Sequence, residues 1–451
     1  MHTLTADNEA LARAVVERAL ARRRDIPSPA TPPDADALNP RLGAAITAGG
    51  IGGEAALDLF TTVVTPASLP IDHPDFLAFV PQAPSEAAIY ADWLVSATPT
   101  FAGAWHDGTG FVAAENAALA WLAGCAGLPA GAGGCFVPGA TIGTLSALHA
   151  ARHTAAARAQ AAGRSRPPRW AVVTSAEAHA SVGLATRVMD VDLVIAPTGP
   201  DHRLHGDAVA ATLDAEGGRV CAVVAAAGTT NLGVIDALPG IAAACEARGV
   251  WLHVDGAYGG AVVASPRARP RLAGIERASS LVIDPHKWLF APYDCCALLY
   301  RDPALAAPAL TPRAEYIDPA HAASAWNPFS YGLHLSRRPR GVPLWFSLAV
   351  YGTDTYAAAI DDTLALARAA ADEIRARPHL SLILEPALSV LAFRRVGWSA
   401  ADYARWSARL LDDRRGWVAP SSLDGAPALR FCLVNPRVTL DGLRAVLDTL
   451  A

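Results

Sequence analysis

The chain has 451 residues, of which 52% are hydrophobic and 18% charged, and its formal net charge at pH 7 is −5. This length and apolar content predict a globular protein with a large buried core and two or three structural units. The negative balance supplies no basic surface for a phosphate backbone, which argues against nucleic-acid binding as the main activity.

Other features of the composition narrow the class further. No apolar run approaches the roughly 20 residues of a membrane span, and the N-terminus lacks a basic patch followed by an apolar stretch. We therefore expect a cytoplasmic protein without a membrane segment. The seven cysteines are scattered, odd in number and mostly embedded in apolar sequence, which is typical of reduced core residues. Because no Cys-x-x-Cys pair or His-x-x-x-His array is present, we predict no metal site.

The predicted elements begin with an N-terminal arm over residues 1–78. A helical pattern covers residues 8–23, and the proline-rich residues 25–40 are predicted to form no regular element. Over residues 79–350, apolar runs alternate with Ala-rich helical stretches, the pattern of βαβ units around a largely parallel sheet. We interpret these residues as one large domain.

The last part of the chain, residues 351–451, has a different pattern. A long Ala- and Leu-rich helical stretch over residues 355–377 is followed by three short apolar runs, at residues 380–384, 389–393 and 428–433. Helices and strands in this order predict a small C-terminal α+β domain.

Two polar residues follow apolar runs in the large domain. Asp255 comes after the run 250–254, and Lys287 comes shortly after the run 280–283. Ligands of open α/β sheets bind beyond the carboxyl ends of the strands. An amine that forms a Schiff base and an acid that keeps a pyridine nitrogen protonated are the groups that pyridoxal phosphate needs. Taken singly, such an aspartate is more often a cap and such a lysine a solvated charge.

The sequence motifs around Asp255 and Lys287 are more specific than either residue alone. The run His-Val-Asp-Gly-Ala-Tyr at residues 253–258 and the run Asp-Pro-His-Lys-Trp at residues 284–288 resemble the group II pyridoxal phosphate decarboxylases. Asp284 stands where that family often has Asn. The resemblance implies an α/β protein of fold type I, with a mainly parallel seven-stranded sheet, helices on both faces and a small C-terminal α+β domain. It also implies a homodimer with a shared active site.

The resemblance assigns cofactor contacts residue by residue. Gly-Ala-Thr at residues 139–141 opens a helical stretch, where a helix N-terminus favours a phosphate, and it resembles the family's phosphate loop. An ordinary strand-to-helix turn is the alternative. Lys287 is then the Schiff-base lysine and Asp255 the partner of the ring nitrogen. The full set of implied contacts is Ala140, Thr141, His179, Thr230, Asp255, Ala257, Asp284, His286 and Lys287.

Two of the implied catalytic residues lie outside these runs. His179 resembles the family's histidine that stacks on the cofactor ring and reaches the substrate carboxylate, although a lone histidine is more often structural. Tyr316 falls at the distance after Lys287 where the family carries a proton-donating tyrosine on a mobile loop; a packing aromatic is the alternative. Residues 318–331 are expected to form a lid.

Substrate choice depends on other segments. The resemblance places a side-chain pocket at two segments and an arginine near the C-terminus, with the candidates Phe79, Pro81, Gln82, Phe101, Gly103 and Arg430. Gly103 replaces a bulkier aromatic residue of the animal aromatic decarboxylases, so we expect a wider or reshaped pocket. An aromatic or otherwise bulky L-amino acid is the favoured substrate, and an acidic one bound by Arg430 or Arg437 is the alternative.

The predicted activity is decarboxylation of an L-amino acid to its amine and carbon dioxide. A decarboxylating aldehyde synthase shares every feature except the fate of the carbanion, which reacts with oxygen. The presence of both His179 and Tyr316 favours the decarboxylase. A cofactor-binding protein without turnover is the third reading, and no DNA-binding module or long disordered arm supports it.

Overall fold

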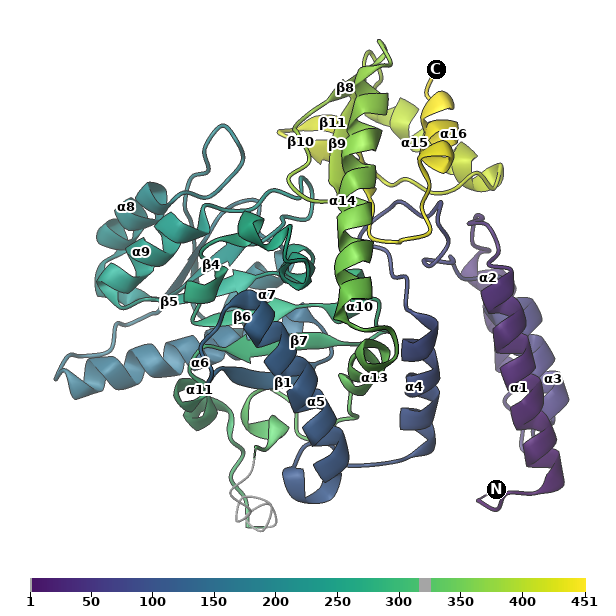
Figure 1. The fold of residues 1–451 in the computed structure, drawn as a ribbon, viewed down its shortest axis with the longest axis horizontal. Helices are drawn as coiled ribbons and strands as arrows, with labels where there is room; N and C mark the ends of the chain where they lie inside the picture. The colour runs from purple at the N-terminus through teal and green to yellow at the C-terminus, as the bar shows by residue number, and fades with distance from the viewer. Residues whose placement is uncertain (1, 316–325) are drawn as a thin grey trace.

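The computed structural model describes residues 2–315 and 326–451. Its centre is a seven-stranded sheet with the order β1-β7-β6-β5-β4-β2-β3 (Figure 1). The strands are β1 (Gly133–Val137), β2 (Ala171–Thr174), β3 (Asp192–Ile195), β4 (Val220–Ala226), β5 (Trp251–Asp255), β6 (Ser280–Ile283) and β7 (Cys296–Tyr300). β7 runs antiparallel to both of its neighbours, β1 and β6, and the remaining pairs are parallel. The predicted mainly parallel sheet is confirmed.

The central strands are buried along almost their whole length because helices cover both faces of the sheet. All seven residues of β4 are buried. One face packs against α6 (Ala140–Ala161) and α7 (Ala180–Met189), and the other against α5 (Trp105–Ala126), α8 (Gly206–Glu216) and α9 (Leu238–Arg248). Two separate clusters of buried residues, one on each face, form the core of this part of the chain.

Short helices complete the large body. They are α4 (Glu86–Ala97), α10 (Pro285–Trp288), α11 (Pro303–Leu310) and α13 (Val342–Tyr351), with a 3-10 turn over Gly259–Ala264. None of the helices in the described residues combines the length and hydropathy needed to cross a lipid bilayer.

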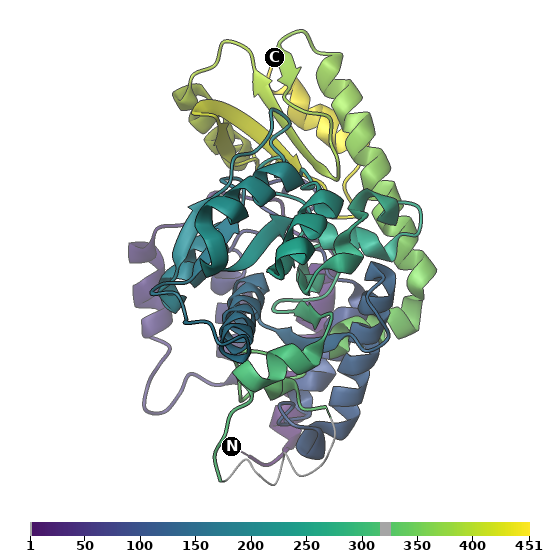
Figure 2. The ribbon, with the colours of Figure 1, turned by 90° about the vertical axis from the view of Figure 1, so that its left-hand side faces the viewer.

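The C-terminal part of the chain forms a second, smaller unit with its own sheet. A four-stranded antiparallel sheet has the order β10-β11-β9-β8 and is covered by α14, α15 and α16. Its elements are α14 (Thr353–Arg375), β8 (Leu380–Leu382), β9 (Val390–Arg395), α15 (Ala400–Asp412), β10 (Pro420–Leu423), β11 (Ala426–Cys432) and α16 (Leu440–Asp448). α14 runs from the large body up to this sheet (Figures 1 and 2). The predicted small α+β unit is confirmed, and the boundary at residues 350 and 351, which falls at the end of α13, stays a prediction.

The N-terminal arm differs from its prediction in one place. α1 (Ala6–Arg24) covers the predicted helix and lies beside α3 (Gly53–Leu59), which is followed by a π-helical turn over Phe60–Val64 (Figure 1). The expectation that residues 25–40 contain no regular element was wrong, because α2 (Ala35–Gly43) begins within them. Pro40 lies inside this helix. In a helix of nine residues, a proline at the sixth position removes one backbone hydrogen bond, which such a short exposed helix tolerates.

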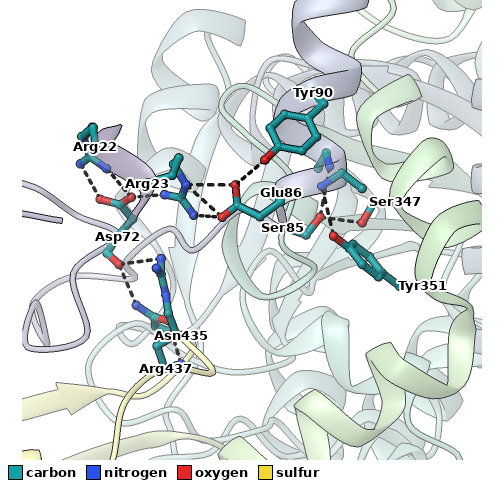
Figure 3. Close-up of polar contacts among 12 residues, drawn as sticks. Arg22, Arg23, Asp72, Ser85, Glu86, Tyr90, Ser347, Tyr351, Asn435 and Arg437 are labelled. Atoms are coloured by element: carbon teal, nitrogen blue, oxygen red, sulfur yellow. Dashed lines mark hydrogen bonds and ion pairs between the residues drawn. The ribbon is translucent and has the colours of Figure 1, made fainter. Parts of the chain in front are cut away.

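A polar network ties the arm to both other parts of the chain (Figure 3). The Arg22 guanidinium donates two hydrogen bonds of 2.8 Å to the Asp72 carboxylate, and Arg23 donates to Glu86 at the start of α4. The Asp72 carbonyl accepts from Asn435 at 3.0 Å and from Arg437 at 3.2 Å. The segment of the arm that contains Asp72 is therefore held by α1 on one side and by the C-terminal unit on the other.

Candidate active site

A cavity of about 210 Å³ opens at the carboxyl ends of β4, β5 and β6 and at the N-terminus of α6. All nine predicted cofactor contacts line it, namely Ala140, Thr141, His179, Thr230, Asp255, Ala257, Asp284, His286 and Lys287. The strands bring these residues together because parallel neighbours end at the same edge of the sheet. Residues spread over almost 150 positions of the sequence thus share one cavity.

Lys287 lies at the floor of the cavity, in the single turn of α10. Its Nζ donates to Oδ2 of Asp284 at 2.9 Å, and Nε2 of His286 lies 3.5 Å from the same oxygen. Burial lowers the pKa of Lys287, but the Asp284 carboxylate, with a smaller contribution from Asp255, raises it above its ordinary value. For Asp284 burial acts in the opposite direction, and the neighbouring Lys287 holds the carboxyl pKa below its ordinary value.

Asp255 ends β5 at the wall of the cavity. Its Oδ1 accepts a hydrogen bond of 3.0 Å from the amide of Ala257. The amide of Gly256, which lies between these two residues, donates to the Val282 carbonyl on β6. These bonds fix the carboxylate in an ordered turn after the strand. It can thus serve as a charged partner for a cationic group in the cavity.

His179 is the N-cap residue of α7 and is exposed at the cavity entrance. Its Nδ1 accepts a hydrogen bond of 3.2 Å from the Ser181 amide and lies 2.8 Å from the Ser181 hydroxyl. Because Nδ1 acts as an acceptor, the neutral imidazole carries its proton on Nε2. A histidine held in this way can present both a ring face and an N–H donor to a ligand.

The N-terminus of α6 supplies the anion-binding feature. Gly139 is the extended N-cap, and its carbonyl accepts the amides of Ile142 and Gly143, so the amides of Ala140 and Thr141 are among the first-turn donors that a helix leaves without an intrahelical partner. The helix has 22 residues, and its dipole favours a phosphate at this end. Together with the lysine and the carboxylates, this donor set fits a phosphorylated pyridine aldehyde.

Comparison with known proteins points to the same cofactor that these donor groups fit. A family model described as the pyridoxal-dependent decarboxylase conserved domain matches residues 57–396. The chain belongs to this family. It is 35% identical to the L-2,4-diaminobutyrate decarboxylase of Rhizobium meliloti (strain 1021), over 89% of this chain and 82% of that protein. It is 30% identical to the aromatic-L-amino-acid decarboxylase of Bacillus atrophaeus, over 92% and 88% of the two chains.

Solved structures agree in fold. Oryza sativa TDC with PLP and tryptamine superposes with a TM-score of 0.92 at 25% identity, covering 100% of this chain and 99% of that one. The Rhodiola rosea 4-hydroxyphenylacetaldehyde synthase superposes at 0.89 with 19% identity, covering 99% and 98%. The predicted family, fold type I, the class of carboxy-lyase and the cofactor pyridoxal phosphate are thus confirmed.

The predicted substrate residues lie elsewhere in this chain. The Phe79 ring is 59% exposed and lies edge-on to Trp417 at 5.2 Å, whereas Gln82 is buried and donates to the Ala291 carbonyl. Neither they nor the buried Pro81 line the cavity. Val80, between them, does.

Phe101 and Gly103 belong to a separate cluster. A Cβ atom on Gly103 would lie 2.6 Å from both the Leu335 carbonyl oxygen and the Phe101 ring. The absence of a side chain at Gly103 thus makes room for Leu335 and Phe101, and it creates no open volume beside Gly103 within the same chain. Arg430, on β11, is 6% exposed, and its Nε and Nη2 have no hydrogen-bond partner among the described residues. Tyr316 lies outside the described residues.

Several lining residues were missed by the sequence analysis. Gly139 lies within a quoted motif, and Gly228 and Thr229 directly precede the predicted contact Thr230, so neighbouring positions could have indicated them. Tyr258 ends a quoted motif, and its buried ring stacks on Trp288 at 5.3 Å. The Tyr258 hydroxyl lies 2.6 Å from that of Ser389, and the Ser389 amide donates to it, so Tyr258 connects the cavity wall to the C-terminal unit. Nothing in the sequence indicates this contact.

Proposed function

We propose that this chain decarboxylates an L-amino acid to the amine and carbon dioxide, with Lys287 as the residue that carries the cofactor. The observation that supports the proposal is the joint presence of Lys287, Asp255 and His179 on one small cavity at the N-terminus of α6. When bound, pyridoxal phosphate supplies an aldehyde that condenses with amines and a ring that accepts the electron pair of the broken bond.

Different residues of the chain are proposed to bind different parts of the cofactor. The amides of Ala140 and Thr141 receive the phosphate, Nζ of Lys287 holds the aldehyde, and the Asp255 carboxylate keeps a proton on the ring nitrogen by charge pairing. Thr230, Ala257 and His286 border the same cavity and complete the contacts around the ring.

His179 is proposed to act on the substrate side. Its exposed ring lies at the entrance, and its Nε2–H is free to donate because Nδ1 accepts from Ser181. In this position the imidazole would cover one face of the cofactor ring, and its Nε2–H would bind and orient the substrate carboxylate.

Tyr316 is proposed as the proton donor to the former α carbon, on the basis of the sequence resemblance. The proposal separates the decarboxylase from the aldehyde synthase. Tyr316→Phe removes the hydroxyl but keeps the ring, so loss of carbon dioxide continues while amine formation falls by roughly 10²–10⁴-fold. Under air the variant is expected to make aldehyde, ammonia and peroxide. Product analysis with and without oxygen measures how much amine and how much aldehyde are formed. Amine formation at the wild-type rate would show that Tyr316 is a packing residue.

The substrate is proposed to be an aromatic or otherwise bulky L-amino acid. The chain's relatives include decarboxylases named for diaminobutyrate, aromatic and acidic amino acids, so family membership leaves the side chain open. The acidic class is a second candidate, because the buried Arg430 has two N–H-bearing nitrogens without a partner in the described chain.

We further propose a cytoplasmic homodimer. Phe101 and Gly103 lie away from the cavity of their own chain, which supports their contribution to the substrate pocket of a second copy. All seven cysteines are free, as expected in a reducing compartment. Sedimentation of the purified protein tests the dimer, and a monomer with full activity would refute the shared site.

The activity is tested by a screen of L-amino acids, including 2,4-diaminobutyrate, glutamate and tryptophan, for release of carbon dioxide and amine. Lys287→Ala is the matched control, since it removes the side chain that carries the cofactor. Release from at least one substrate, abolished in the control, is expected. Absence of release from every amino acid, with the cofactor bound, would overturn the proposed function.

A further inference from the structure

Asp284 is a buried charge in direct contact with Lys287. Its side chain is 3% exposed, and its Oδ2 receives the Lys287 Nζ at 2.9 Å. Its Oδ1 has no hydrogen-bond partner in the described chain, and the weakly donating thiol of Cys296 is a further side chain beside Lys287 that interacts with the carboxylate as a donor. A carboxylate taken out of water in this way is stable only beside a countercharge.

The surroundings of Asp284 leave Lys287 as its main countercharge. His286 lies 3.5 Å away, but burial lowers the pKa of its imidazole, so it is neutral at neutral pH. Its Nδ1 accepts from the Cys295 amide at 3.1 Å, which places the proton on Nε2, toward Asp284. The other titratable groups facing the pair are thiols, a phenol and carboxyl groups, none of which supplies a positive charge: Cys295, Cys296, Cys432, Tyr293, Asp255 and Asp294.

We propose that Asp284 keeps the nitrogen of Lys287 protonated when that nitrogen is joined to the cofactor, so that the resting enzyme stays in its reactive, cationic form at alkaline pH. Loss of the proton would leave the Asp284 carboxylate buried without a cation. Asparagine at this position can form hydrogen bonds but carries no charge. It would therefore stabilise the protonated form of the Lys287 nitrogen less than Asp284 does. This inference rests on the proposed role of Lys287 as the cofactor-carrying residue.

The first test is an absorbance titration of the holoenzyme. The protonated linkage absorbs in the visible range and the neutral one in the near ultraviolet, so the pH midpoint of the change reports the proton on Nζ. Asp284→Asn removes the charge without changing the size of the side chain, and should lower the midpoint by about 1–3 pH units, the usual effect of an opposite charge at contact distance. Asp294→Asn is the matched control. The Asp294 carboxylate also faces this region but pairs with Arg340 at 2.8 Å. The midpoint of the Asp294→Asn variant should therefore stay much closer to that of the wild type than the midpoint of Asp284→Asn.

The second test needs no bound cofactor. The rate at which acetic anhydride modifies Lys287 in the apoprotein, followed by mass spectrometry of the peptide as pH is varied, gives the pKa of the free Nζ. Asp284→Asn should lower this pKa relative to the wild type and the Asp294→Asn control. An unchanged midpoint in the holoenzyme, or an unchanged Lys287 profile in the apoprotein, overturns the inference. Neither readout requires turnover, so failure of the proposed decarboxylation leaves this test intact.

Discussion

The strongest effect on stability is predicted for a buried ion pair between α5 and the segment after the predicted lid. The Arg337 guanidinium donates to the two oxygens of Glu115 at 2.6 Å each, and also to the Ala102 carbonyl at 2.7 Å. The exposed fraction of the two side chains is 0% and 2%. Burial lowers the pKa of Arg337, but the Glu115 carboxylate raises it above its ordinary value, so the guanidinium keeps its charge. The Gly341 amide also donates to Glu115, at 2.8 Å.

Arg337→Met removes the cation and leaves the Glu115 carboxylate buried with the Gly341 amide as its remaining partner from this group. Breaking a buried pair from one side costs about 3–5 kcal/mol. For a unit of this size the loss corresponds to a fall in the thermal midpoint on the order of 10 °C. The double variant Arg337→Met with Glu115→Leu should recover part of the loss, because no unpaired charge remains in the core.

The assay is thermal unfolding of the apoprotein at fixed concentration and pH. Arg338→Met is the matched control. It removes the neighbouring arginine, whose ion pair with Asp92 is partly exposed, and such pairs contribute about 0–1 kcal/mol. Equal effects of the Arg337 and Arg338 substitutions, or a double variant less stable than Arg337→Met alone, would refute the reasoning that burial of the charge sets the cost.

Three further predictions follow from the site and the core. Borohydride treatment of the yellow holoenzyme should fix the cofactor on Lys287, as peptide mapping would show, and label on another lysine would contradict the assignment. Asp255→Ala should keep the fold, checked by circular dichroism, and lose at least ~100-fold in rate, the order of a missing charge-stabilising group; near-normal turnover would show that another acid does this work. Burial lowers the pKa of His253 to about 3, so the unfolded chain binds a proton at higher pH than the folded one. Its contribution to stability is therefore present above the unfolded pKa of about 6.5 and is lost as the pH falls toward the folded value; denaturation midpoints between pH 7 and pH 5 in wild type and His253→Gln would test this, and equal slopes would contradict it.

Much of the site was determined by the sequence, because its chemistry lies in short contiguous runs at the ends of strands. An apolar run followed by Asp255, and another followed by Lys287, predicted both the strands and the edge of the sheet where they meet. All nine predicted contacts reached one cavity for this reason. The α/β class with a largely parallel sheet followed from the same runs, because strands buried on both faces are apolar over most of their length. Fold type I followed from the resemblance of the motifs to the decarboxylase family.

Only the tertiary structure decided the contacts between distant segments. Val80 enters the cavity while its neighbours Phe79 and Pro81 do not. Tyr258 reaches Ser389 across 131 residues of sequence, and Glu115 meets Arg337 across 222. Such pairs depend on how the layers pack, and a single side chain carries no local signal of a partner so far along the chain. The segments proposed to confer substrate choice belong to this second kind, whereas the lysine and the carboxylate proposed to carry the chemistry belong to the first.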